Sequence, residues 1–102
     1  MRKKLYPHSV KVGKRRYKIK MVRDLSDGKG QRLRGYCDPN KPHTLYLDKD
    51  QSQAELFSTF WHEVLHAIEV EHKIKLPHKL VYALEGPIAA VLKANFRLSF
   101  RR

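Results

Sequence analysis

The hydrophobic period of the chain changes at Ser52, and this change restricts the fold more than any other feature. Before Ser52, apolar side chains alternate with basic ones, which is the period of a sheet with one face in water. After Ser52, apolar side chains recur every three to four residues, which is the period of a helix packed on a core. We therefore predict an α+β fold, in which a small twisted antiparallel sheet of three or four strands is followed by two helices.

The length and composition indicate one globular domain. With 102 residues, the chain has room for a single domain over residues 1–102, and 41% of the residues are apolar, as in globular proteins. The single cysteine, Cys37, excludes an intrachain disulfide and is expected to be a small buried hydrophobe. No apolar run approaches the ~18 residues that span a bilayer. We expect a cytoplasmic protein with no membrane contact.

The N-terminal half predicts short strands. Residues 8–23 alternate on both sides of Gly13, and glycine favours the tight turn of a β-hairpin. Residues 24–32 have the composition of a loop, and residues 35–38 form a short strand that Pro39 ends. Residues 44–48 predict another strand. Its shortness and the preceding Pro42 are typical of a sheet edge.

The C-terminal half predicts two helices. Ser52 and Glu55 have the spacing of a capping box, so the first helix is expected from Ser52 to about His72. Pro77 can open the second helix, because the first turn needs no N–H from it. At residues 86–87, Gly-Pro predicts a kink or a break in that helix. The tail, residues 97–102, has few apolar anchors and is expected to fray.

The first predicted helix contains the motif H-E-x-x-H at residues 62–66. His62 and His66 are one helical turn apart, so their imidazoles project from one face and can bind one Zn²⁺ ion. Glu63 lies about 100° around the helix, where it can reach a water and act as the general base. The only charged residue from Thr59 to Ile68 is Glu63, and burying these polar groups unpaired would cost several kcal/mol. The alternative is a helix with two histidines and no metal.

A zinc hydrolase needs a third protein ligand and leaves a fourth position for water. Glu85 on the second predicted helix is favoured, because a carboxylate among apolar neighbours requires a cation. His72 has the ligand spacing of the metzincins. In this sequence, however, Glu69 stands where the metzincin pattern has the glycine that turns the chain. Without that turn the helix continues, and His72 points away from His66. His78 or another residue is the remaining candidate.

The stretch Thr59–Ile68, followed by a helix that carries Glu85, resembles the gluzincin branch of the zincin metallopeptidases. It is similar in particular to the minimal zincins found as small proteins of bacteriophages and bacteria, over about residues 43–96. The resemblance implies a zinc-dependent peptidase in which His62, His66 and Glu85 bind zinc and Glu63 is the general base. The sequence departs from the thermolysin-type pattern, which has Asn immediately before and Asp four residues after the glutamate.

The same resemblance implies where a peptide or protein substrate would bind. In zincins the strand before the active-site helix lines the cleft, which corresponds to residues 44–48, and an extended substrate could pair with that strand. A further donor would stabilise the oxyanion of the reaction. The candidates are Tyr82, Tyr36 and His78, with Tyr82 first because it lies one turn before Glu85.

The charge of the chain, +12 overall, is concentrated at its start, where residues 1–34 hold 13 basic and 2 acidic side chains. The basic hairpin makes nucleic acid a candidate partner through phosphate contacts, although a solvated strand face has the same pattern. The alternative function is therefore a non-catalytic basic module that binds nucleic acid or a host protein, with a structural or vestigial metal site.

Overall fold

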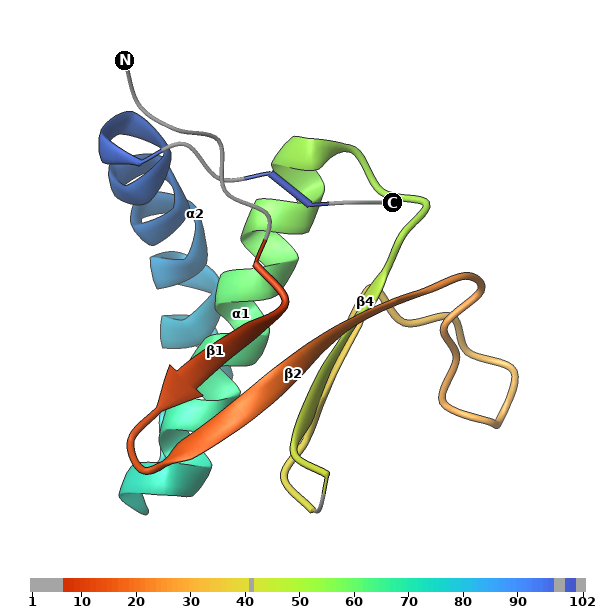
Figure 1. The fold of residues 1–102 in the computed structure, drawn as a ribbon, viewed down its shortest axis with the longest axis horizontal. Helices are drawn as coiled ribbons and strands as arrows, with labels where there is room; N and C mark the ends of the chain where they lie inside the picture. Colours follow the sequence, from red (N-terminus) through yellow and green to blue (C-terminus); the bar gives the residue numbers. More distant parts are fainter. Residues whose placement is uncertain (1–6, 41, 97–98, 101–102) are drawn as a thin grey trace.

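A computed structural model describes residues 7–40, 42–96 and 99–100 (Figure 1). The elements in chain order are β1 (Ser9–Val12), β2 (Arg15–Val22), β3 (Gly35–Asp38), β4 (Thr44–Asp48), α1 (Gln53–His72) and α2 (His78–Asn95). The predicted α+β class, a small sheet followed by two helices, is confirmed. One face of the sheet packs on α1, and α2 packs on α1 to form an outer layer (Figure 1). No described helix is both long enough and apolar enough to cross a membrane.

The four strands are ordered β1-β2-β4-β3. The pairs β1–β2 and β3–β4 are antiparallel, but β2 and β4 are parallel, so the prediction of a wholly antiparallel sheet is wrong in this one pairing. The position of residues 44–48 is also corrected, because β4 pairs on both sides and β3 lies at the edge. Leu45 and Leu47 of β4 are completely buried, which explains why this strand is central.

The predicted hairpin is confirmed, with Gly13 and Lys14 between β1 and β2. Gly13 has φ = +60°, a left-handed conformation that favours glycine. The hairpin is tied to the end of α1 by Tyr17, whose buried hydroxyl donates a 2.7 Å hydrogen bond to Glu71. Arg15 forms an ion pair with the same carboxylate at 3.9 Å.

Helix α1 starts as predicted. Ser52 accepts a hydrogen bond from the backbone N–H of Glu55, and the Glu55 carboxylate accepts one from the backbone N–H of Ser52, which completes the capping box. The apolar side of α1 forms the core with the inner face of the sheet. The buried residues of this core are Val12, Tyr17, Leu45, Leu47, Leu56, Phe57, Phe60, Val64, Ala67, Ala89 and Phe100.

Two expectations for the C-terminal part are corrected. Helix α2 continues through Gly86 and Pro87, so the expected break does not occur, and the other expectation for this point, a kink, stays a prediction. Pro87 has no N–H to donate to the carbonyl of Ala83, four residues earlier in the helix. Both residues are exposed, so water can hydrate that carbonyl instead. Phe100 is buried and packs on Phe57, and its backbone bonds to Gln53, so the tail is anchored at this residue. The rest of the expected frayed tail, apart from Ser99, lies outside the described residues.

Candidate metal and active site

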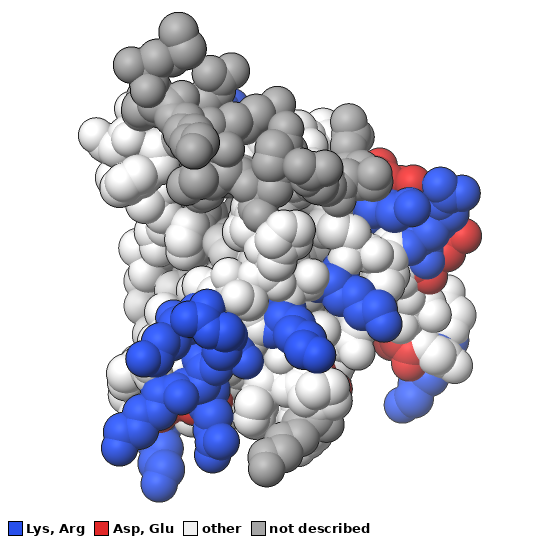
Figure 2. Space-filling model, viewed as in Figure 1, with Lys and Arg blue, Asp and Glu red and all other residues white. Residues whose placement is uncertain are grey.

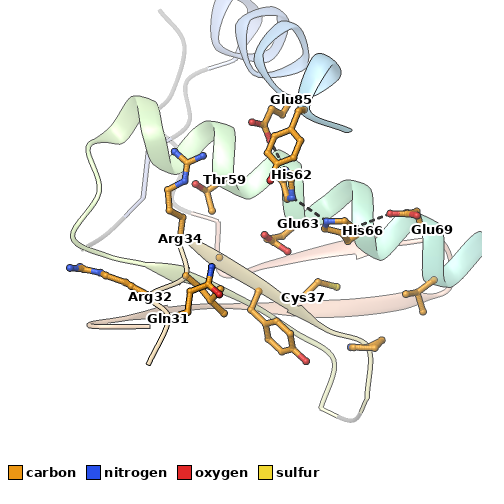
Figure 3. A pocket seen from close by; sticks show the side chains of 16 residues that line it. Gln31, Arg32, Arg34, Cys37, Thr59, His62, Glu63, His66, Glu69 and Glu85 are labelled. Carbon is orange, nitrogen blue, oxygen red and sulfur yellow. Dashed lines mark hydrogen bonds and ion pairs between the residues drawn. The ribbon is translucent and has the colours of Figure 1, made fainter. Parts of the chain in front are cut away.

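Helix α1 presents His62 and His66 side by side, as the motif spacing predicts (Figure 3). Their Nε2 atoms face each other at 3.1 Å, and their ring centroids are 4.7 Å apart. The Nδ1 atoms of both rings contact carboxylates instead: His62 contacts Glu85 at 2.7 Å, and His66 contacts Glu69 at 2.9 Å (Figure 3). Each imidazole is therefore held from one side, with its other nitrogen directed at the same point.

These contacts indicate which nitrogen of each neutral ring carries the proton. An ionised carboxylate only accepts hydrogen bonds, so each Nδ1 carries a proton and donates it. Burial lowers the pKa of His62, and the nearby carboxylate of Glu85 offsets only part of this effect. In the neutral rings, both Nε2 atoms then hold a lone pair, and the two lone pairs face each other at 3.1 Å. Such a pair is stabilised by a cation between the rings, either a proton or a metal ion.

Glu69 is a residue of the site that the sequence analysis missed. It was considered only as the replacement of a glycine. In the structure, its carboxylate accepts hydrogen bonds from His66 and, at 2.9 Å, from the backbone N–H of Leu76. These contacts, the backbone one foremost, lower the pKa of Glu69. The signal in the sequence was the spacing of three residues after His66, which puts the two side chains on one helix face.

Glu63 lies between α1 and the sheet, below the two imidazoles (Figure 3). Its residue is only 6% exposed, and no described residue donates a hydrogen bond to its carboxylate. Burial raises the pKa of this carboxyl to about 7, and the negative charge of Glu85 adds to the effect. A carboxyl with this pKa can both take up and release a proton near neutral pH.

Gly35 allows β3 to approach α1 closely beside Glu63. A Cβ atom at this position would lie 2.6 Å from Cγ2 of Thr59 and 3.0 Å from Oε2 of Glu63. Real Cβ atoms essentially never lie as close as 2.6 Å to another side chain, so Thr59 or β3 would have to shift if residue 35 were larger. The sequence showed a glycine at the start of a strand, but nothing in it indicated the partner across the cleft.

The chain preceding β3 is anchored by side chains from two other elements. The amide of Gln51 donates to the carbonyls of Arg34 and Asp48, at 3.0 and 2.8 Å, and accepts a hydrogen bond from the Thr59 hydroxyl at 2.8 Å. Arg32 donates to the buried carboxylate of Asp48 at 2.9 Å. Burial raises the pKa of Asp48, but hydrogen bonds from Arg32 and the Asp50 backbone outweigh this effect and lower it overall.

Between these elements lies an open cleft of about 730 Å³. Its walls are residues 31–37 with β3, the motif face of α1, and Tyr82 and Glu85 of α2. Residues 44–48, the strand expected to line the cleft, do not reach it, because β4 lies inside the sheet with β3 between it and the edge. The strand beside the cleft is therefore β3.

The structure separates the other candidate ligands. Glu85 contacts the His pair, although at Nδ1 of His62 rather than at the point between the Nε2 atoms. His72 does not line the cleft: its ring lies near Gly13 of the hairpin turn. The ring centroid of His78 is 5.5 Å from that of His66, and the ring centroid of Tyr82 is 5.0 Å from that of His62.

Within the described part of the chain, no group of three or more His, Cys, Asp or Glu side chains is arranged to hold a metal ion. The site as built is a pair of imidazoles with a carboxylate on the outer nitrogen of each and a buried acid below. In comparisons with family models, curated proteins and solved structures, no match to the chain was found.

Proposed function

We propose that the protein is a zinc-dependent peptidase that hydrolyses peptide bonds in the cleft between α1, α2 and β3. The observation that supports this proposal is the pair of Nε2 atoms of His62 and His66, which face each other at 3.1 Å above the buried Glu63. This arrangement combines two metal ligands with a candidate general base.

The donor set fits zinc. Zinc binds imidazole nitrogen at about 2.0–2.1 Å, so one ion can reach two nitrogen atoms whose separation is below about 4 Å. A ligating histidine usually donates its other ring N–H to a carboxylate, which fixes the ring and its tautomer. His62 and His66 both have such a partner, in Glu85 and Glu69.

We propose Glu85 as the third protein ligand, because α2 brings its carboxylate beside the His pair, although it would have to leave Nδ1 of His62 to reach a metal ion between the Nε2 atoms. A second assignment is favoured by the same contact. If Glu85 stays on Nδ1 of His62 as a supporting carboxylate, His78 is the nearest remaining ligand, on the side of His66. Either assignment leaves one position for water, which a catalytic zinc site requires.

The chain's own residues would carry the proton transfers. When bound, zinc lowers the pKa of a water to about 7 and polarises the scissile carbonyl. Glu63 takes a proton from the attacking water while the oxygen of that water adds to the carbonyl carbon. Glu63 then passes that proton to the amine as the C–N bond breaks, and a pKa of about 7 suits both transfers. The hydroxyl of Tyr82, at the mouth of the cleft, is a candidate donor to the oxyanion.

The proposed substrate is an extended segment of a peptide or protein. Of the described strands, β3 pairs only with β4, so its other edge is available for backbone hydrogen bonds. A substrate that added to this edge would lie along the cleft past Glu63 and the His pair. β3 thus takes the role that the sequence analysis assigned to residues 44–48.

Cys37 lies in the cleft but is not proposed as a ligand. Burial and the charge of Glu63 raise the pKa of its thiol to about 12, so the thiol stays protonated and is a poor metal ligand. The single cysteine can form no intrachain disulfide, which suits a reducing compartment, and we propose a cytoplasmic location.

The proposal is tested by zinc analysis and peptide cleavage. Glu63→Gln should keep the zinc of the wild type and lose at least about 100-fold in cleavage of quenched fluorescent peptides, because only the base is removed. His62→Ala and His66→Ala should lose zinc and cleavage together, whereas the exposed control His8→Ala should lose neither. A wild-type protein that binds no zinc, or a Glu63→Gln variant that cleaves normally, would contradict the proposal.

The third ligand is decided by three parallel alanine variants, at Glu85, His78 and His72. Loss of zinc in Glu85→Ala with zinc kept in His78→Ala supports Glu85. The reverse result assigns His78 as the ligand and leaves Glu85 a positioning residue. His72→Ala should keep zinc, because its ring lies at the hairpin turn.

A further inference from the structure

The face of the sheet that is turned away from α1 has a composition unlike the rest of the molecule. Gly35 and Cys37 of β3 are directed at α1 and the core, so Tyr36 between them lies on the opposite face. In β4, Leu45 and Leu47 enter the core, so Tyr46 lies on this opposite face as well. We call it the open face of the sheet.

The hairpin gives the open face a row of unpaired positive charges. Lys11, Arg16, Lys18 and Lys20 are exposed, and none forms an ion pair with a described residue. Figure 2 shows Lys and Arg side chains gathered over the β1–β2 hairpin and along β2. By contrast, Arg15, whose position in β2 puts it on the inner face, forms an ion pair with Glu71.

Acidic side chains do little to neutralise this row. The strands place two acids on the open face, Asp38 and Asp48. Asp48 is buried and is bound by Arg32. Asp38 accepts a hydrogen bond from the backbone of Asn40 and is separated from Lys18 by Thr44 of the central strand.

Two aromatic rings lie on the open face beside the basic row, on the two neighbouring strands. The strand register places Lys20, Tyr46 and Tyr36 opposite one another on β2, β4 and β3. The two tyrosine rings are stacked, with centroids 6.3 Å apart and an angle of 30° between their planes. Tyr36 is 48% exposed, so an outer aromatic ring is accessible to a ligand next to the basic row.

We propose that the open face of the sheet binds single-stranded nucleic acid, with its phosphates along β2 and an unpaired base on Tyr36. Alternate residues of a strand are about 6.6 Å apart, so Arg16, Lys18 and Lys20 form a line of cations along the strand. Phosphates are attracted to such a line, and every base has a flat surface that can stack on an aromatic ring. In a duplex the flat surfaces of the bases are stacked inside, and an acidic protein has no bases. A duplex or an acidic protein would therefore be bound through the basic row alone.

The first experiment measures binding of fluorescent single-stranded oligonucleotides, of both DNA and RNA, to the full chain by anisotropy. Four contacted phosphates predict a slope of log K against log salt of about −2.8. Lys18→Ala with Lys20→Ala should reduce the slope to about −1.4 and weaken binding, since two contacts are lost. The matched control, Lys79→Ala with Lys93→Ala on α2, removes the same charge and should leave both values unchanged.

The second experiment tests the stacking contact. Tyr36→Ala should weaken binding of single strands at least fivefold, whereas Tyr36→Phe, which keeps an aromatic ring, should bind as the wild type does. Circular dichroism checks that each variant is folded. A duplex or a polyglutamate peptide should bind more weakly than the single strand and should be insensitive to Tyr36→Ala. If they bind equally well, or if the control pair on α2 weakens binding as much as the β2 pair, the open face is not a single-strand site.

This inference is independent of the proposed peptidase activity. Tyr36 also borders the cleft, but Arg16, Lys18 and Lys20 do not line it, so chelation of metal and Glu63→Gln should leave oligonucleotide binding unchanged. Conversely, Lys18→Ala with Lys20→Ala should leave cleavage of a short uncharged peptide unchanged. Oligonucleotide binding that is lost on chelation would contradict the assignment to the open face.

Discussion

The two helices both supply residues to the candidate site, but the fold holds them very differently. Helix α1 has eight buried residues and a complete capping box, whereas α2 has two buried residues, Val81 and Ala89, and no side-chain N-cap bond. His62, Glu63 and His66 therefore stand on the better packed of the two helices. Glu85 stands on α2, and among the described helices and strands α2 makes extensive contacts with α1 alone.

This difference matters for the chemistry of the site. The raised pKa of Glu63 arises mainly from burial, so it depends on the packing of α1 against β3. The contact of Glu85 with His62 depends on the docking of α2, which leaves Leu80, Tyr82, Val91 and Phe96 largely exposed. We infer that packing of the core determines the pKa of Glu63, whereas the position of the Glu85 carboxylate depends on the interface between α1 and α2 alone.

The largest contrast is expected for matched truncations of leucine on the two helices. Leu56→Ala removes a completely buried side chain of the core and should cost about 2–5 kcal/mol in the free energy of unfolding. Leu80→Ala, at a position that is 42% exposed, should cost less than about 1 kcal/mol. Urea unfolding measures both values, and equal losses would show that α2 is packed as tightly as α1.

Glu63 should make the metal-free protein less stable as the pH rises. Its folded pKa of about 7 exceeds the ordinary value of 4.5, so the folded state binds the proton more tightly than the unfolded chain does. The free energy of unfolding should therefore fall between about pH 4.5 and pH 7, by up to about 3 kcal/mol, and stay low above that.

Glu63→Gln removes this dependence, so at pH 8 the variant should be more stable than the wild type, and at pH 4 the two should be similar. Urea unfolding in the presence of a chelator, across this pH range, measures the difference and isolates Glu63 from other titrating groups. A constant difference between the two proteins would mean that Glu63 titrates normally.

Two glycine-to-alanine substitutions should have opposite signs. Gly35→Ala brings a Cβ atom against Thr59 and Glu63 and should destabilise the protein by about 1–3 kcal/mol. Gly86→Ala in α2 meets no atom within 4 Å apart from its chain neighbours, and because the following Pro87 disfavours helical backbone at a residue with a Cβ, the gain in helix propensity should be reduced to less than about 0.5 kcal/mol. Thermal unfolding of both variants checks the signs, and a stabilising Gly35→Ala would place β3 further from α1.

A small effect is expected at the helix start. Ser52→Ala removes the side-chain half of the capping box of α1 and should cost about 1 kcal/mol. Ser58→Ala, inside the same helix, replaces serine with a better helix former and should cost nothing. Chemical unfolding at one pH compares the two, and equal costs would mean that the cap contributes little to the stability of α1.

Much of the fold and part of the site could be predicted because their signals are local. The capping box joins Ser52 and Glu55, the hairpin turn needs only a glycine at residue 13, and the approach of His62 to His66 follows from helical pitch. Each depends on residues within about one turn of helix or strand, where backbone geometry leaves few alternatives.

Other predictions failed where a second segment decides the outcome. Residues 44–48 were expected at a sheet edge because the strand is short, but completely buried leucines at positions 45 and 47 require a central place in the sheet. The carboxylate partner of His66 was overlooked, since Glu69 was judged only against a glycine of another pattern.

The amino-acid sequence by itself determined the two periods, the helix start, the hairpin turn and the spacing of the two imidazoles. Tertiary structure alone decided the strand order, the parallel pairing of β2 with β4, and the position of β3 beside the motif helix. It also brought Glu85 to His62 across 23 residues of chain. The physical reason is that local hydrogen-bond geometry is set by neighbouring residues, whereas the choice of strand and helix partners depends on which surfaces exclude water together.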